Sequence, residues 1–293
     1  MQNKENILEM KAIDKFFPGV KALDKVDFSV KEGEVHCLIG ANGAGKSTLM
    51  KVLSGAYKED GGEIWFNGEQ LKPRGTLDRR NKGIAVIYQE LSLFNDLDVA
   101  ENVFIGNYPR TGLGTVDWKE LYRKTDELIA SLNIDIKSHS KVSDLSIGHR
   151  QMTEIMKALA CNAKLIVMDE PSSTLSMAEF EILKRVIADL TKKGITIIFI
   201  SHHLEELFIV GERVTVMRDG KFVTCQNLKD ITIDELVEFM TGAKVEKKDT
   251  VQEKRELSDE VVLEVKHLKN SKVDDINMKL HKGEILGMYG LVG

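Results

Sequence analysis

The chain has 293 residues, of which 42% are hydrophobic and 30% charged, so it can form one large or two modest globular domains. Its net charge of −5 argues against a dedicated nucleic-acid binder, which is usually basic. The three cysteines, Cys37, Cys161 and Cys225, lack the spacing of a metal site. The N-terminus has no apolar core of a signal peptide, and the longest apolar runs are too short to span a bilayer. We therefore expect a cytoplasmic protein that reaches a membrane only through a partner.

Short apolar runs bounded by turn signals indicate strands in the first part of the chain. Residues 28–30 and 35–39 flank a lysine-glutamate-glycine turn, residues 64–66 precede Asn67-Gly68, and residues 84–88 form a further run. The dipeptide Asn-Gly is a strong signal for a tight hairpin turn. The segment at residues 7–80 is therefore predicted to be rich in strands.

A glycine-rich loop follows the predicted strand at residues 35–39 and precedes a helical pattern. The loop fits the phosphate-binding pattern G-x-x-x-x-G-K-[ST] in the context that this pattern needs, and its spacing differs from that of a dinucleotide-binding loop. Its backbone N–H groups and the helix N-terminus can hold a polyphosphate, Lys46 can reach the β- and γ-phosphates, and Ser47 can bind Mg²⁺. The residues predicted to bind the nucleotide here are Gly40, Asn42, Gly43, Ala44, Gly45, Lys46, Ser47 and Thr48.

Helical periodicity dominates from about residue 97 to residue 161. Apolar residues recur every three or four positions in two stretches, and we expect these stripes to face a core. The stripes consist of Leu121, Leu128, Ile129 and Leu132, and of Met152, Ile155, Met156 and Leu159.

Two acidic residues, Asp169 and Glu170, directly follow a buried apolar run at residues 165–168. At the carboxyl end of a strand, Asp169 can hold Mg²⁺ through water, and Glu170 can orient and deprotonate an attacking water. A solvated acidic loop is the alternative. The buried strand and the phosphate loop in the same chain favour the catalytic interpretation.

An α/β pattern returns after residue 161. A helical stripe within residues 180–190 ends at Lys193-Gly194, and residues 195–200 form the continuous apolar run typical of a parallel sheet. Asp219-Gly220 indicates a hairpin, and a last helix stops at Gly242. Residues 1–242 are therefore predicted to form one nucleotide-binding domain of the α/β class.

Residues 243–260 are mostly charged, lack apolar periodicity and are predicted to be a linker. The residues that follow repeat the start of the chain, because Gly283 and Gly290 correspond to Gly33 and Gly40, and 283 − 33 and 290 − 40 both equal 250. A period of this length indicates a duplicated domain. We expect residues 261–293 to be the truncated start of a second copy, which ends at Gly293 before its lysine position.

The segment Leu145-Ser146-Ile147-Gly148-His149 resembles the signature loop of the ATP-binding-cassette (ABC) ATPases, usually L-S-G-G-Q, and lies upstream of the Asp-Glu strand as it does in that family. Ser146 and Gly148 match the loop, whereas Ile147 and His149 depart from it. The resemblance implies an α/β fold with a P-loop NTPase (RecA-like) core, an antiparallel β-subdomain and an inserted α-helical subdomain at about residues 97–161. In the family, this loop binds the γ-phosphate held by an opposing cassette.

The resemblance also implies roles for residues outside the phosphate loop. Gln89 matches the Q-loop glutamine, which ligates Mg²⁺ and senses the membrane partner, and His202 matches the histidine that contacts the γ-phosphate. Phe17 matches the aromatic residue that stacks on adenine, with Phe16 and a plain core role as alternatives. Ser176 replaces the aspartate of the D-loop. The implied catalytic residues are Glu170 and His202, and the implied metal ligands are Ser47, Gln89 and Asp169.

The pattern is most similar to the tandem ATPases of bacterial importers for ribose, galactose or xylose. This implies a chain that binds ATP and Mg²⁺, hydrolyses ATP and powers a separate membrane permease fed by a sugar-binding protein, at the inner face of the cell membrane. A second cassette is an expected partner, and nucleic acid is not. The alternatives are a soluble tandem ATPase acting on ribosomes, against which the short linker argues, and a regulatory nucleotide sensor, against which Glu170 and His202 argue.

Overall fold

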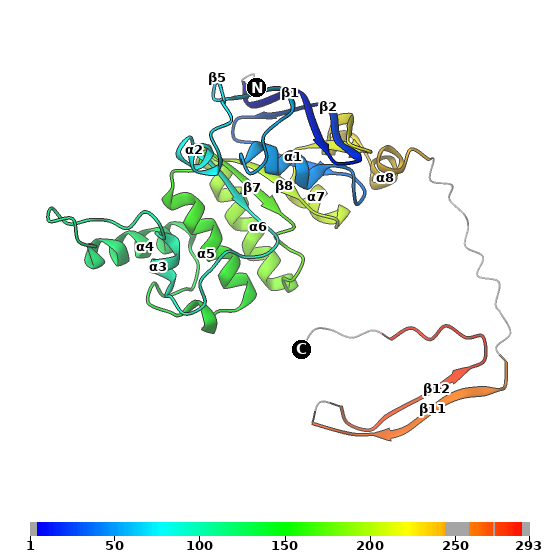
Figure 1. Cartoon of the computed structure of the whole chain (residues 1–293). Coiled ribbons are helices and arrows are strands. Elements are labelled where there is room, and N and C mark those ends of the chain that lie inside the picture. Colours follow the sequence, from blue (N-terminus) through cyan, green and yellow to red (C-terminus); the bar gives the residue numbers. More distant parts are fainter. Residues whose placement is uncertain (1–4, 244–257, 272, 289–293) are drawn as a thin grey trace. The chain divides into compact units, whose positions relative to one another are not determined.

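A computed structural model describes residues 5–243, 258–271 and 273–288 of the chain (Figure 1). The chain divides into two units, Met1–Val245 and Glu246–Gly293, which are described separately. Most of the predicted linker, residues 244–257, lies outside the described residues, as do Gly290 and Gly293 of the predicted second phosphate loop.

The first unit begins with an antiparallel sheet in the order β2-β1-β4-β5. Its strands are β1 (Asn6–Phe17), β2 (Val20–Lys31), β4 (Gly61–Phe66) and β5 (Glu69–Gln70). The predicted Asn67-Gly68 turn joins β4 to β5, and both residues have the positive φ that a tight hairpin turn requires. The predicted abundance of strands in this region is confirmed.

A six-stranded sheet in the order β10-β9-β3-β8-β7-β6 forms the centre of the unit. The five strands from β9 to β6 run parallel, and β10 pairs antiparallel with β9 through the predicted Asp219-Gly220 turn. The strands are β3 (Val35–Ile39), β6 (Ile84–Ile87), β7 (Leu165–Asp169), β8 (Thr196–Ile200), β9 (Arg213–Arg218) and β10 (Lys221–Asn227).

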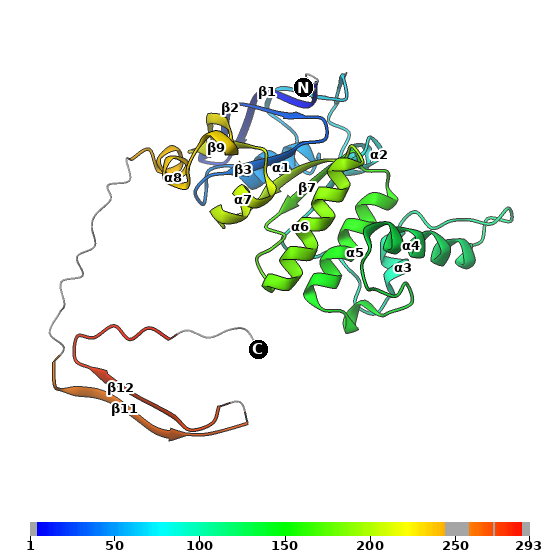
Figure 2. The ribbon, with the colours of Figure 1, turned by 180° about the vertical axis from the view of Figure 1, so that it is seen from behind.

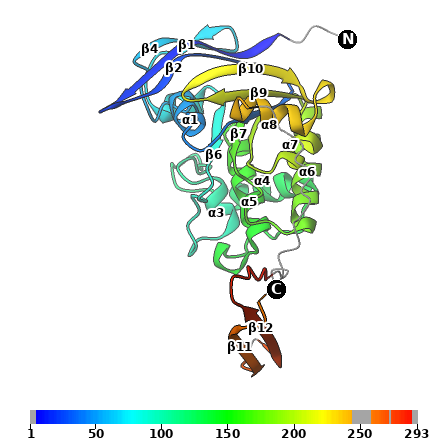
Figure 3. The ribbon, with the colours of Figure 1, turned by 90° about the vertical axis from the view of Figure 1, so that its right-hand side faces the viewer.

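Both faces of the central sheet are buried, because successive side chains of its strands enter two different cores. In β8, Ile197 and Phe199 belong to one core, while Ile198 and Ile200 belong to the other. The second of these cores fills the space between the central sheet, α1 and the antiparallel sheet (Figure 3). This double burial explains why residues 195–200 are a continuous apolar run.

Helices cover the other face of the central sheet. Helices also form the inserted region, which lies at the end of the first unit away from the antiparallel sheet (Figures 1 and 2). The inserted region contains α3 (Val99–Val103), α4 (Trp118–Leu132), the 3₁₀ turn η1 (Val142–Asp144) and α5 (Ile147–Ala160). The other helical elements are α1 (Lys46–Leu53), α2 (Thr76–Asn81), α6 (Met177–Lys192), α7 (Leu204–Val210), the turn η2 (Leu228–Asp230) and α8 (Ile233–Thr241). No helix in the described ranges has both the length and the apolar character needed to cross a membrane.

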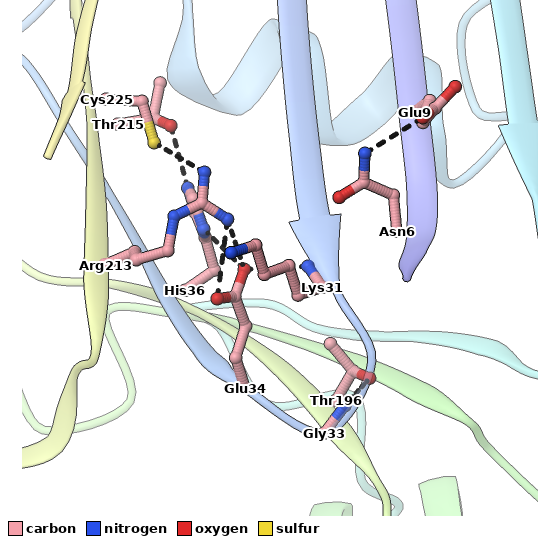
Figure 4. Close-up of polar contacts among 10 residues, drawn as sticks. All are labelled: Asn6, Glu9, Lys31, Gly33, Glu34, His36, Thr196, Arg213, Thr215 and Cys225. Carbon is pink, nitrogen blue, oxygen red and sulfur yellow. Dashed lines mark hydrogen bonds and ion pairs between the residues drawn. The ribbon is translucent and has the colours of Figure 1, made fainter. Parts of the chain in front are cut away.

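A polar cluster lies inside the first unit, where the strand β3 begins (Figure 4). The Glu34 carboxylate accepts hydrogen bonds from the Lys31 N–H (2.8 Å) and from Arg213 Nη1 (3.1 Å), and its Oε1 lies 3.0 Å from His36 Nδ1. The other ring nitrogen of His36 lies 2.7 Å from the Thr215 hydroxyl. The cluster therefore ties the start of β3 to β9.

In the described residues of the second unit, β11 (Val261–Leu268) and β12 (Ile276–His281) form an antiparallel hairpin. The two copies share a hydrogen bond at the offset of 250 residues found in the sequence. The Lys31 N–H donates to Glu34, and the His281 N–H donates to Glu284, both at 2.8 Å. The described residues 285–288, which correspond to the start of β3, form no strand. In the first unit, β3 is held by pairing on both sides with β8 and β9.

Candidate nucleotide site

The phosphate-loop residues lie between β3 and α1, at the carboxyl edge of the central sheet. Gly43 and Gly45 have φ angles of +83° and +98°, a backbone region that glycine adopts without strain. A Cβ atom on Gly40 would lie 2.3 Å from the carbonyl oxygen of Met217 in β9. The shape of the loop therefore depends on glycine at all three positions.

A cavity of about 580 Å³ opens at this loop, and its volume is within the usual range of ligand sites. Most of the predicted site residues line it: Asn42, Gly43, Ala44, Gly45, Lys46, Ser47, Thr48, Gln89, Asp169 and Glu170. Its lining also includes residues that we did not predict, namely Val20, Lys21, Ala22, Asp219 and Gly220. Gly220 is brought there by its N–H bond to the Ala44 carbonyl, a contact between distant turns that leaves no local sequence signal.

Lys46 opens α1 and folds back over the loop that precedes it. Its ammonium group donates to the carbonyl oxygens of Gly40 (2.7 Å) and Ala41 (3.2 Å). Burial lowers the pKa of Lys46, and the negative charges of Glu170 and Asp169 oppose this shift. A half-buried cation at a helix N-terminus is an arrangement that attracts phosphate.

The two acidic residues stand at the carboxyl end of β7, facing the phosphate loop. Asp169 is the last residue of the strand and pairs in register with Ile200 of β8. Burial raises the pKa of Asp169, the neighbouring Glu170 charge adds to this effect, and Lys46 opposes it. A nearby divalent cation favours the ionised carboxylate for the same electrostatic reason.

Glu170 is held by contacts from three directions. Its backbone has a φ of +50°, which few non-glycine residues adopt, and its N–H donates to the Ile200 carbonyl (2.9 Å). The carboxylate accepts from Gln89 Nε2 (3.0 Å) and lies 3.4 Å from His202 Nδ1. The structure thus brings together three of the predicted residues, although His202 does not line the cavity itself.

These groups fit the cofactor that the phosphate loop implies. Mg²⁺ prefers oxygen ligands and is usually held by one or two carboxylates together with the phosphates of its nucleotide. The cavity offers such oxygens on Ser47, Gln89 and Asp169. Among the described residues, no three His, Cys, Asp or Glu side chains gather into a metal cage, so a metal bound here would depend on the nucleotide.

Phe17 ends β1, outside the lining of the cavity. Its ring packs edge-on against Tyr57 at 5.4 Å between centroids, and the Lys15 ammonium lies 5.5 Å from its centre. Phe16 is more exposed than Phe17, and Lys21 lies over its ring. The core role considered for Phe17 does not apply, because 37% of the residue is exposed.

The signature-loop residues lie at the N-terminus of α5. Ser146 is the N-cap, whose hydroxyl accepts the His149 N–H (3.3 Å), and Gly148 is in the first turn of the helix. Ser146 and Gly148 share a partner that the sequence did not indicate, the carboxylate of Glu179 in α6. Ser176, at the D-loop position, is the N-cap of α6.

A second cavity, of about 430 Å³, lies beside β6 and the segment that follows Gln89. Glu154 of α5 accepts from the N–H (2.6 Å) and the hydroxyl (2.9 Å) of Ser92, and Lys157 donates to the Ser92 carbonyl (2.9 Å). The neighbouring Phe94 is 56% exposed. The segment is therefore fastened to α5 by polar contacts while an aromatic side chain remains at the surface.

The fold and these loops are those of an ATP-binding cassette, and the chain belongs to the ABC transporter family, which matches residues 23–173. It is similar to the galactose/methyl galactoside import ATP-binding protein MglA of Clostridium perfringens, with 42% identity over 100% of this chain and 57% of that protein. It is also similar to the ribose import ATP-binding protein RbsA 1 of Rubrobacter xylanophilus, with 46% identity over 98% of this chain and 57% of that protein. The chain thus spans somewhat more than half of the length of these relatives.

Solved structures lead to the same fold. A nucleotide-free ATP-binding cassette from an ABC transporter superposes with a TM-score of 0.72 and 28% identity, covering 82% of this chain and 100% of that one. The ADP conformation of the cassette MJ1267 has the same TM-score, identity and coverage. The predicted phosphate-loop NTPase fold, with its antiparallel sheet and helical region, is confirmed.

Proposed function

We propose that this chain binds Mg-ATP in the cavity around Lys46 and hydrolyses it, as the ATPase part of a monosaccharide importer. The observation that carries the proposal is the convergence of Lys46, Asp169, Glu170 and Gln89 on one cavity. The names of the similar import proteins support transport of a sugar. The alternatives, an ATPase acting on ribosomes and a regulatory sensor, have no counterpart among those relatives.

In this mechanism the loop N–H groups and Lys46 hold the phosphates, and Glu170 takes the proton of the attacking water. Glu170 is suited to this task because Gln89 and His202 orient its carboxylate, at 3.0 and 3.4 Å. Bound Mg²⁺ supplies charge neutralisation between the phosphates. Asp169, Ser47 and Gln89 are its proposed ligands, and Phe17 is the proposed contact for adenine.

We further propose that the partners are a membrane permease, a sugar-binding protein and a second cassette, and that the chain works at the inner face of the membrane. The exposed Phe94, two residues along the chain from Ser92 in the lining of the cavity at β6, supports contact with the permease there. The hydrogen-bond repeat at Glu284 supports a second cassette that begins near residue 261. Ser146 and Gly148 are then the proposed signature-loop groups that bind the nucleotide held by another cassette.

The test measures Mg-ATP affinity by calorimetry and turnover by phosphate release. Lys46→Ala should abolish binding, because the phosphates lose their main cationic partner. Glu170→Gln should keep binding and lower turnover about 10²–10⁴-fold, the typical contribution of a positioned base. Lys192→Ala and Glu181→Gln, on the exposed side of α6, are the matched controls and should change neither quantity. Unchanged affinity in Lys46→Ala would refute the site.

A further inference from the structure

Glu179 connects the signature loop, which is proposed to face another cassette, to Ser176 at the D-loop position. It lies in the first turn of α6, and the helices α5 and α6 run side by side (Figures 1 and 2). Its Oε2 accepts from the N–H (3.0 Å) and the hydroxyl (2.9 Å) of Ser176. Its Oε1 accepts from the hydroxyl of Ser146 (3.0 Å) and from the N–H of Gly148 (3.0 Å). One carboxylate therefore receives four hydrogen bonds, two from each loop.

This carboxylate is ionised and closely fitted. The N–H of Ser176 is the main cause that lowers the pKa of Glu179, burial opposes it, and the two serine hydroxyls and the Gly148 N–H lower it further. A Cβ atom on Gly148 would lie 2.6 Å from Glu179 Oε1. The approach of the carboxylate thus depends on the missing side chain of Gly148.

The groups that Glu179 occupies are those that suit a phosphate. A serine hydroxyl and a backbone N–H at the N-terminus of a 14-residue helix form an anion-binding set. Two anionic oxygens cannot share the same donors, and a phosphate brought beside Glu179 would meet a like charge at short range. A phosphate can bind to Ser146 and Gly148 only after the carboxylate has moved away.

We propose that Glu179 controls the signature loop: its carboxylate occupies the phosphate-binding groups of Ser146 and Gly148, and the phosphate of another cassette binds there by displacing it. The proposal rests on the function proposed above for Ser146 and Gly148. Because the other oxygen of Glu179 accepts hydrogen bonds from the N–H and the hydroxyl of Ser176, displacement also changes the contacts of Ser176 at the D-loop position. Phosphate binding at one loop is in this way transmitted to the other.

The experiment compares ATP-dependent self-association of the full chain by analytical ultracentrifugation. All samples carry Glu170→Gln, so that bound Mg-ATP persists. Glu179→Gln keeps the size of the side chain but removes its charge, and the new NH2 group cannot accept a hydrogen bond from the serine hydroxyls or backbone N–H groups around it. Adding this substitution should tighten the dimer about tenfold. Glu179→Asp keeps a charge and a helix cap but is one methylene too short to reach Ser146, and it should also tighten the dimer. Glu181→Gln, on the exposed face of α6, is the control and should leave the dimer unchanged.

The direction of the change separates this role from a purely structural one. Loss of a helix cap weakens α6 and can only weaken association, whereas release of an occupied site strengthens it. An unchanged or weaker dimer in both Glu179 variants, or no dimer in any sample, would overturn the proposal. Mg-ATP calorimetry on the parent is run in parallel, and absence of binding would refute the proposed ATP function itself. With binding intact, no dimer in any sample would count against the proposed signature role of Ser146 and Gly148, and an unchanged or weaker dimer in both Glu179 variants would count against Glu179 alone.

Discussion

The cluster around Glu34 allows a prediction about stability whose size follows from its contacts (Figure 4). Replacing Glu34 by alanine removes the acceptor of the Lys31 N–H and the Arg213 guanidinium and the partner of His36. His36 is fully buried and cannot turn to water, and the side chain of Arg213 is only 18% exposed. Because breaking a buried ion pair on one side typically costs about 3–5 kcal/mol, we expect Glu34→Ala to lower the free energy of unfolding by that amount.

Glu34→Gln separates the charge from the hydrogen bonds. All three close contacts are made by Oε1, so a glutamine with its carbonyl oxygen in that place keeps the geometry. Hydrogen bonds to charged groups contribute about 1.5–3 kcal/mol and neutral ones about 0.5–1.5 kcal/mol, so losing the charge should cost about 1–2 kcal/mol. The glutamine variant should therefore be clearly more stable than the alanine variant.

Urea unfolding followed by tryptophan fluorescence is the suitable assay, because both tryptophans, Trp65 in β4 and Trp118 in α4, lie in the first unit. Glu181→Ala on the surface is the control and should change the free energy of unfolding by at most about 1 kcal/mol. An alanine variant at position 34 within 1 kcal/mol of the parent, or a glutamine variant as unstable as the alanine one, would show that the cluster does not stabilise the fold as we reason.

The same cluster predicts the pH dependence of stability. Burial lowers the pKa of His36, although Glu34 opposes this, so the unfolded chain takes up a proton first as the pH falls below about 6.5. Burial raises the pKa of Glu34, but His36, the Lys31 N–H and Arg213 together lower it below 4.5. Both groups therefore bind protons more readily in the unfolded chain than in the folded one. Their contribution to the free energy of unfolding should be constant above about pH 6.5 and should fall progressively as the pH is lowered. A parent chain that gains stability between pH 6.5 and 4.5 would contradict this.

Two further predictions concern single side chains. Phe17→Ala should weaken ATP binding about 5- to 150-fold, since stacking on a base contributes about 1–3 kcal/mol. Phe16→Ala should change the affinity less than twofold in the same calorimetric titration, and the reverse order would assign the adenine contact to Phe16. Cys37 is fully buried, and burial raises the pKa of its thiol. A thiol reagent should therefore label Cys161 and Cys225 in the folded chain, and Cys37 only after denaturation. Fast labelling of Cys37 in the folded chain would contradict its buried position.

The sequence was sufficient to predict the elements that depend on local patterns. The strand at residues 35–39, the glycine loop after it and the acidic pair at the end of β7 each combine a clear local pattern with distinctive residue types. The helix α2 (Thr76–Asn81) was not predicted, because six residues with two arginines carry no apolar stripe. Short helices of this kind are stabilised by tertiary contacts more than by their own propensity.

Contacts between distant segments could not be predicted in the same way. In the structure Glu179 completes a capping box with Ser176 at the start of α6, and nothing local in the sequence indicates that its other oxygen reaches Ser146 and Gly148. The approach of Gly220 to Ala44 likewise results from the neighbouring positions of β3 and β9 in the sheet. The roles of the site residues remain predictions that the experiments above address.

The backbone of Glu170 has a consequence for the evolution and engineering of this protein. With a φ of +50° it occupies a conformation that glycine or asparagine adopts at lower cost, and a strained non-glycine residue typically loses about 1–3 kcal/mol. Selection for stability alone would therefore favour Glu170→Gly or Glu170→Asn, and either change removes the carboxylate that Gln89 and His202 orient. With the role proposed above for Glu170, stability and turnover are in conflict at this position, and a library screened only for heat resistance should enrich well-folded chains that lack the proposed ATP hydrolysis.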